Sequence, residues 1–157
     1  MSSSPRGAIW TSAIVALVLT LVPLPGWLTI LRPDFLVLVV FYWSVQTPRS
    51  VGVGFGWICG MLLDAFQGPV LGEHALAVAL VAYLAVREHQ RIRTKPLLQQ
   101  ALVLLAVLVL YEFVLWAIDG WSGHPLTTPL RWVPALTGAL LWPLVAGVLA
   151  QSYRLRA

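Results

Sequence analysis

The chain has 157 residues, of which 59% are hydrophobic and only 10% are charged, and its formal net charge is +4. This composition excludes an ordinary water-soluble domain, and the mean hydropathy of +0.85 indicates an integral membrane protein. The basic residues stand at the edges of apolar runs, which excludes a continuous nucleic-acid-binding face. We therefore expect an all-α fold: one polytopic bundle of transmembrane helices covering residues 1–157.

Six apolar runs follow one another along the chain, separated by short polar or Pro/Gly-rich segments. A helix needs roughly 20 apolar residues to cross about 30 Å of hydrocarbon, so six spans with short loops would use nearly the whole length. The second run is short and follows Arg32-Pro33-Asp34, so a segment that enters without crossing is an alternative that leaves five spans. The expected spans are residues 8–24, 35–46, 51–66, 70–86, 98–118 and 133–150.

The distribution of Lys and Arg predicts the orientation of the chain. With six spans and a cytoplasmic N-terminus, eight of the ten basic residues face the cytoplasm, and the five-span alternative scores equally well. Both alternatives place the C-terminus and the basic segment 87–95 in the cytoplasm, and the 67–69 turn and the 119–132 loop outside. Besides setting orientation, the basic segment could bind anionic lipid headgroups or a cytoplasmic protein through Arg87, Arg91, Arg93 and Lys95.

The third run carries small residues at helical spacing. Gly52, Gly56, Gly60 and Asp64 recur every four residues, so a helix would place all four on one face. Glycines on one face admit another backbone closely, which is how transmembrane helices associate. Two interpretations remain open: packing within the chain, or a docking groove for the helix of a partner protein.

Ionisable residues gather around the turn between the third and fourth runs. Asp64 closes the glycine face, and Glu73 and His74 begin the fourth run, with Glu112 of the fifth run as a further candidate. A carboxylate in or near the hydrocarbon needs a partner. The group is either a polar cap that fixes the hairpin by hydrogen bonds, or a proton relay or cation site.

Templates for catalysis are missing from the sequence. It contains no H-E-x-x-H, P-loop or G-x-S-x-G motif, and Gly52-Val-Gly lies inside a span without a preceding strand. The lone Cys59 has no partner thiol and is interpreted as a small core residue. We therefore expect no enzyme activity, no cofactor and no resident metal.

Short motifs in one segment carry a family resemblance. Gly60-Met-Leu-Leu-Asp64 fits a G-x-L-L-D pattern, and the stretch from Leu71 through Gly72 and His74 to Leu76 fits L-G-x-H-A-L. With these motifs, residues 32–86 resemble the family of rod shape-determining protein MreD. Further matching residues are Arg32-Pro33-Asp34, Tyr42-Trp43, Pro48-Arg49, Gly68 and Ala82-Tyr83-Leu84.

The resemblance implies a bacterial inner-membrane protein of the cell-elongation (rod) complex that supports lateral peptidoglycan synthesis. Its implied direct partner is the bitopic protein MreC, in a complex with MreB, a RodA-type glycosyltransferase and a class B penicillin-binding transpeptidase. It also implies a fold like the substrate-binding component of energy-coupling-factor transporters, which favours six spans. The alternative function is binding or transport of a small, vitamin-like solute, since Asp64, Glu73 and His74 could line a ligand site.

Overall fold

The structure is a computed structural model that describes residues 5–67, 70–124 and 128–156. Every regular element in these residues is a helix, as the composition predicts. The expected site residue Gly68 falls outside the described residues. The elements are α1 (Pro5–Leu21), α2 (Trp27–Leu31), α3 (Phe35–Gln46), α4 (Val53–Gln67), α5 (Glu73–Arg87), α6 (His89–Arg93), α7 (Leu97–Trp121), the short 3-10 helix η1 (Pro129–Trp132) and α8 (Val133–Arg156).

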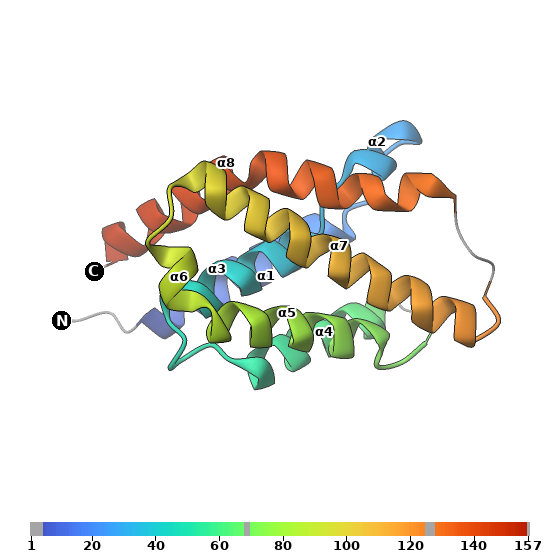
Figure 1. The fold of residues 1–157 in the computed structure, drawn as a ribbon, viewed down its shortest axis with the longest axis horizontal. Helices are drawn as coiled ribbons and strands as arrows, with labels where there is room; N and C mark the ends of the chain where they lie inside the picture. Colours follow the sequence, from blue (N-terminus) through green and yellow to red (C-terminus); the bar gives the residue numbers. More distant parts are fainter. Residues whose placement is uncertain (1–4, 68–69, 125–127, 157) are drawn as a thin grey trace.

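The longer helices run side by side between two ends of the bundle (Figure 1). The terminal end is the end where α1 begins, α8 finishes and α6 lies. The hairpin end is the opposite end, where α4 leads into α5 and α7 leads towards α8. Successive long helices alternate in direction between these ends, which is the arrangement that short connections impose on a bundle.

Three segments of the described residues are long and apolar enough to cross a membrane, judged by length and composition. They are Trp27–Gln46 with 20 residues, Leu97–Trp121 with 25 and Pro129–Leu155 with 27, while Pro5–Leu21 and Val53–Gln67 are shorter apolar helices. The first of these segments joins α2 and α3 through the bend at 32–34. The run at 70–86 is helical only from Glu73, because Val70–Gly72 forms the turn that precedes α5.

The second apolar run, α3, forms the centre of the bundle. Every residue from Leu36 to Val45 is buried, and α3 contacts α1, α4, α5, α6 and α8. Its sequence is compatible with this position, because residues 36–45 are apolar around the whole circumference apart from Ser44, and such a helix is buried in protein or in lipid.

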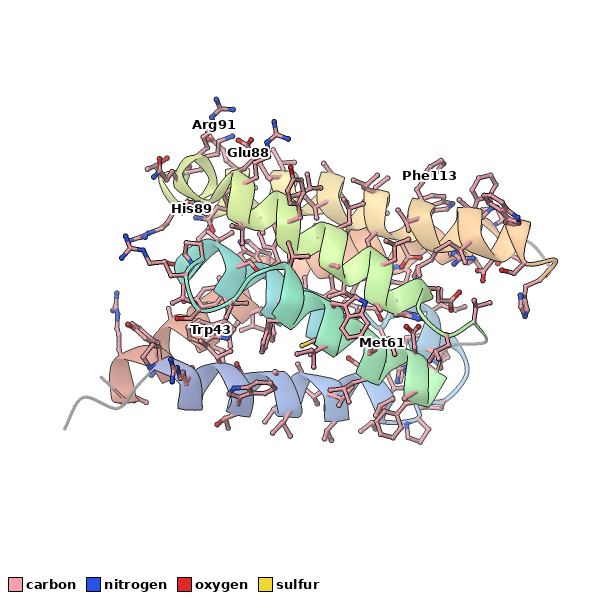
Figure 2. The ribbon with its side chains drawn as sticks, turned by 90° about the horizontal axis from the view of Figure 1, so that it is seen from below. Trp43, Met61, Glu88, His89, Arg91 and Phe113 are labelled. Atoms are coloured by element: carbon pink, nitrogen blue, oxygen red, sulfur yellow. The ribbon has the colours of Figure 1, made fainter. Side chains whose placement is uncertain are left out.

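Two buried indoles tie neighbouring helices together. Trp43 Nε1 of α3 donates a hydrogen bond to Ser12 Oγ of α1 at 2.8 Å, and Trp142 Nε1 of α8 donates to Gln100 Oε1 of α7 at 3.2 Å. Trp43 lies among the helices near the terminal end (Figure 2). A buried indole N–H needs an acceptor, so these bonds fix which helix faces meet.

Candidate functional site at the hairpin end

Acidic residues concentrate at the hairpin end of the bundle. The chain has six Asp and Glu residues, and Glu88 alone lies at the terminal end, at the C-cap of α5. The other five are Asp34, Asp64, Glu73, Glu112 and Asp119, at or near helix ends that meet at the hairpin end. Charged groups in a membrane protein are costly, so this concentration marks the region where function is most readily sought.

The glycine face of α4 packs against α5. A Cβ on Gly56 would stand 2.8 Å from Ala82 Cβ and 3.0 Å from the Val78 carbonyl oxygen, and one on Gly60 would overlap the backbone of Ala75 and His74. Gly52 precedes α4, and a Cβ there would meet nothing within 4 Å. Since α5 fills the face at Gly56 and Gly60, this part of it is closed to the helix of another protein.

Asp64 caps the first turn of α5. Its Oδ2 accepts the backbone N–H groups of Gly72 at 2.9 Å and Ala75 at 3.1 Å, and its Oδ1 accepts the backbone N–H of His74 at 2.9 Å. The first N–H groups of any helix lack partners within the helix. We call Asp64, Gly72, His74 and Ala75 the Asp64 latch, because a carboxylate from one helix holds the start of the next.

The local sequence explains why the latch closes. Gly72 has a φ of +100°, a left-handed conformation that glycine adopts without strain, and it turns the chain so that the N–H groups face α4. Gly60 lets the α5 backbone come within reach of Asp64 one turn further along α4. The negative charge of Asp64 also complements the positive end of the α5 dipole. The G-x-L-L-D and L-G-x-H-A-L motifs are therefore the two halves of one contact.

His74 links the latch to two further groups. Its Nδ1 lies 3.0 Å from Asp64 Oδ1 and 3.5 Å from Glu73 Oε1. Candidate ligand atoms of these three residues lie within 4.8 Å of one another, close enough to share a divalent cation. However, each Asp64 oxygen already accepts two hydrogen bonds, so a cation would displace the cap of α5. The arrangement supports the polar-cap interpretation of this group.

A polar cavity of about 490 Å³ lies beside the latch at the hairpin end. Arg131 of η1 crosses it: Nη1 lies 2.6 Å from Asp119 Oδ2, and Nε lies 3.5 Å from Glu112 Oε2. These three side chains are between 9% and 14% exposed, so the ion pairs are largely buried. Other polar residues lining the cavity are Thr29, Arg32, Asp34, His74 and Thr128.

The sequence interpretation missed three of the cavity residues. Asp34 precedes α3, Asp119 lies in α7 and Arg131 lies in η1, and no repeat or motif connects these three elements. The signal in the sequence that could have found them is that five of the six acidic residues lie near the predicted outer ends of the transmembrane helices. The sequence indicates Glu112 as a candidate, and the structure places it on α7, with its Oε2 3.5 Å from Arg131 Nε.

The remaining candidate residues lie apart from the cavity. Leu71 is exposed on the turn before α5. The basic residues are exposed on α5, α6 and the following turn at the terminal end, where Arg91 and Glu88 project from the bundle in Figure 2 and form an ion pair at 3.2 Å. The four expected residues of this basic surface are Arg87, Arg91, Arg93 and Lys95.

Together, the apolar helices, the latch and the cavity define a helical membrane protein whose polar groups position helices and line a cavity. The sequence model of the family described as rod shape-determining protein MreD matches residues 1–151, and the chain belongs to this family.

A curated relative supports the assignment. The chain is similar to the rod shape-determining protein MreD of Haemophilus influenzae, with 30% identity over 135 residues, which is 84% of this chain and 82% of that protein. No solved structure matches the chain. The expected likeness to the substrate-binding component of energy-coupling-factor transporters therefore stays a prediction.

Proposed function

We propose that this protein is a non-enzymatic scaffold of the bacterial cell-elongation complex in the inner membrane, where it helps to determine rod shape. The observation that carries the proposal is the match of the family along residues 1–151. The structure supports it, because the Asp64 latch uses its polar groups to hold one helix to the next. In this role the protein binds MreC and supports lateral peptidoglycan synthesis, together with MreB, a RodA-type glycosyltransferase and a class B transpeptidase.

The proposed topology has six spans, with both termini in the cytoplasm. Six helices, α1, α3, α4, α5, α7 and α8, run between the two ends in alternating directions. Eight of the ten Lys and Arg residues belong to the terminal end, and cytoplasmic segments are enriched in such residues. The hairpin end then faces outward. The central position of α3 supports six spans over five, because a segment that lay at the surface would not be buried on every side.

We assign the contact with MreC to the hairpin-end cavity. The cavity brings charged side chains from α3, α5, α7 and η1 to one opening, and its ion pairs join side chains and not backbone groups. Such pairs can exchange for charged groups of a partner, and charge complementarity gives specificity in protein complexes. The closed glycine face of α4 offers no comparable opening.

Depletion of the protein in its own rod-shaped host tests the role in cell shape. Rounded cells that regain their shape with the wild-type chain support the scaffold. Normal rods whose growth defect is cured by a nutrient would instead support a transport protein.

Co-purification tests the contact with MreC. The variant Asp119→Asn with Arg131→Gln removes both charges of the cavity pair and should reduce recovery of MreC from detergent extracts. The matched control is Glu88→Gln with Arg91→Gln, which removes the ion pair at the terminal end. Equal recovery with both double variants would contradict the assignment.

A second candidate function is binding of a small, vitamin-like solute. The observation that favours it is the size of the hairpin-end cavity, about 490 Å³, with cationic and anionic side chains on its walls. Pockets for small ligands fall in the range of roughly 300–1,000 Å³. Saturable binding to the purified protein in calorimetry over a ligand panel would support this function, and the absence of heat with every ligand would count against it.

A further inference from the structure

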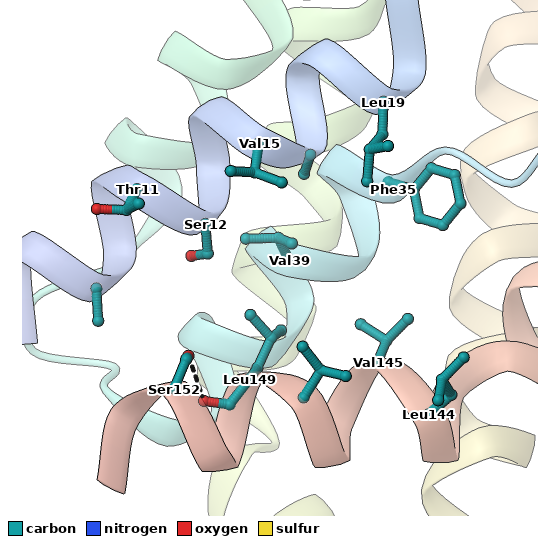
Figure 3. A pocket seen from close by; sticks show the side chains of 13 residues that line it. Thr11, Ser12, Val15, Leu19, Phe35, Val39, Leu144, Val145, Leu149 and Ser152 are labelled. Carbon is teal, nitrogen blue, oxygen red and sulfur yellow. Dashed lines mark hydrogen bonds between the residues drawn. The ribbon is translucent and has the colours of Figure 1, made fainter. Parts of the chain in front are cut away.

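A second cavity opens sideways between α1 and α8, with α3 as its floor (Figure 3). Its volume is about 330 Å³. Thr11, Ser12, Val15 and Leu19 line it from α1, and residues of α8 face them across the gap. We call this cavity the lateral groove. Its α8 and α3 residues are Leu144, Val145, Val148, Leu149, Ser152, Phe35 and Val39.

The edges of the lateral groove face lipid. Val15 and Leu19 on one edge, and Leu144 and Val148 on the other, are 46–65% exposed. Large aliphatic side chains at such exposure on apolar helices contact hydrocarbon in a membrane. The groove is therefore reached from within the bilayer, unlike the polar cavity at the hairpin end.

The length of the groove matches one leaflet of a bilayer. From Ala8 to Leu19 the α1 helix rises roughly 16 Å at 1.5 Å per residue. Half of a hydrocarbon core of about 30 Å is close to this length. A space of about 330 Å³ spread over that distance is narrow compared with a helix, whose diameter with side chains is about 10–12 Å. The dimensions fit an extended acyl chain.

The polarity of the groove changes along its length. Three hydroxyl groups lie towards the terminal end, and each donates to a carbonyl of its own helix: Thr11 to Gly7, Ser12 to Ile9 and Ser152 to Leu149. Because these hydrogens are already used, the hydroxyl groups add little attraction for an anion. The remaining lining residues, from Val15 to Leu19 and across to Leu144, are almost all apolar.

Two exposed arginines flank the groove at the terminal end, whereas Arg32, near the other end, donates a hydrogen bond from its guanidinium to the Val22 carbonyl. Arg6 lies two residues before the first lining residue of α1, and Arg154 lies two residues after the last lining residue of α8. Both arginines are exposed. Arginine side chains are long enough to reach a headgroup at the membrane surface while their stems lie along apolar surface. An apolar slot with a pair of exposed arginines at the terminal end complements an amphiphile that has an anionic head.

We propose that the lateral groove is a binding site for an anionic glycerophospholipid of the leaflet at the terminal end. One acyl chain fills the groove between α1 and α8, and Arg6 and Arg154 contact the phosphate. The bound lipid adds packing contacts between α1 and α8 along the open part of the groove, beside the contacts that the two helices make directly. This proposal depends on the membrane location of the chain and not on the scaffold function.

Native mass spectrometry of the purified protein tests the proposal. The protein is exchanged into detergent with equal amounts of phosphatidylglycerol and phosphatidylethanolamine that carry identical acyl chains. We expect one phosphatidylglycerol to be retained in preference to phosphatidylethanolamine, by at least about fivefold, since each arginine near an anionic headgroup contributes roughly that factor. Equal retention of the two lipids would overturn the proposal.

Variants separate the acyl-chain contact from the headgroup contact. Val148→Phe fills the groove from its exposed edge and should reduce retention of either lipid, whereas Val109→Phe places the same side chain on an exposed face of α7 and should not. Val15→Phe, on the opposite edge, repeats the test if Val148→Phe elutes abnormally in size exclusion. Lipid retention that is unaffected by both groove variants contradicts the assignment.

A second set of variants removes the arginine charges at the terminal end and leaves the lining of the groove unchanged. Arg6→Gln with Arg154→Gln should abolish the preference for phosphatidylglycerol while a lipid is still retained, and Arg93→Gln on α6 serves as the control. An unchanged preference in the double variant would contradict the role of the arginines. If Val148→Phe abolishes co-purification of MreC without changing lipid retention, the groove holds the helix of a partner and the lipid proposal is wrong.

Discussion

The Asp64 latch and the hairpin-end cavity lie at the same end of the bundle, yet their charged groups are paired in different ways. Asp64 is held by three backbone N–H groups of one neighbouring helix turn. In the cavity, Arg131 is held by the side chains of Glu112 and Asp119, next to open space. Backbone donors are fixed by the helix, whereas side chains can rotate to other partners. The comparison suggests that the latch serves the fold and the cavity serves recognition.

The largest expected effect comes from the helix contact behind the latch. Gly60→Leu would place a side chain into the backbone of α5, and we expect a loss of at least about 3 kcal/mol, since overpacking of this extent cannot relax without separating the helices. SDS unfolding titrations followed by tryptophan fluorescence measure the change.

The matched control for this variant is Gly54→Ala, on the same helix but with nothing within 4 Å of the added Cβ. It should change stability by less than about 1 kcal/mol, towards stabilisation, because alanine is the better helix former. Equal destabilisation by the two substitutions would show that α4 does not pack on α5 through Gly60.

The next effect tests the latch itself. Asp64→Ala leaves the N–H groups of Gly72, His74 and Ala75 without their acceptor, and unpaired buried groups cost about 1–3 kcal/mol each. We expect a total near 3 kcal/mol, since water reaches part of this turn. Asp64→Asn keeps one acceptor oxygen and should lie between wild type and alanine in the same titration. If both variants are as stable as wild type, the latch has no structural role.

A smaller effect is expected at the turn. Gly72→Ala forces a non-glycine residue to a φ of +100°, at a cost of about 1–2 kcal/mol. The midpoint temperature of a fluorescent-protein fusion, read by size exclusion after heating, should fall modestly. An unchanged midpoint would indicate that the turn before α5 adopts another conformation.

The last effect concerns the cavity. Arg131→Gln removes two largely buried ion pairs and leaves Glu112 and Asp119 with only the water of the cavity as a partner, so we expect a loss of roughly 1–3 kcal/mol. Its effect on recovery of MreC should be larger than that of Gly72→Ala at comparable membrane abundance. If Gly72→Ala reduced recovery of MreC more than Arg131→Gln did, recognition would belong to the latch and maintenance of the fold to the cavity.

The latch could be anticipated from sequence because its signal is local. The spacing of Gly56, Gly60 and Asp64 gives one helix face, and the turn before His74 is only a few residues away, so the pairing of the two helices follows from a short connection. The choice between a polar cap and a cation site needed the structure, because it depends on which atoms Asp64 contacts.

The cavity could not be anticipated in the same way. Arg131, Glu112 and Asp34 stand on three elements, separated by up to 97 positions in the chain, and their meeting depends on how α3 and α7 pack. The short second run was also ambiguous, because hydropathy and length do not distinguish a central helix from one that enters the membrane only partly. Burial on every face places α3 at the centre of the bundle, and the number of spans stays a prediction.

The uneven distribution of charge along the bundle also couples the molecule to the voltage across its membrane. The terminal end carries eight basic residues and Glu88, which gives seven net positive formal charges. The hairpin end carries the other five acidic residues together with Arg32 and Arg131, which gives three net negative formal charges. Moving one elementary charge through 100 mV changes its energy by about 2.3 kcal/mol. In the proposed orientation, with the terminal end in a negative cytoplasm, the field favours the same direction as the insertion signals, so an energised membrane would oppose inversion of the protein.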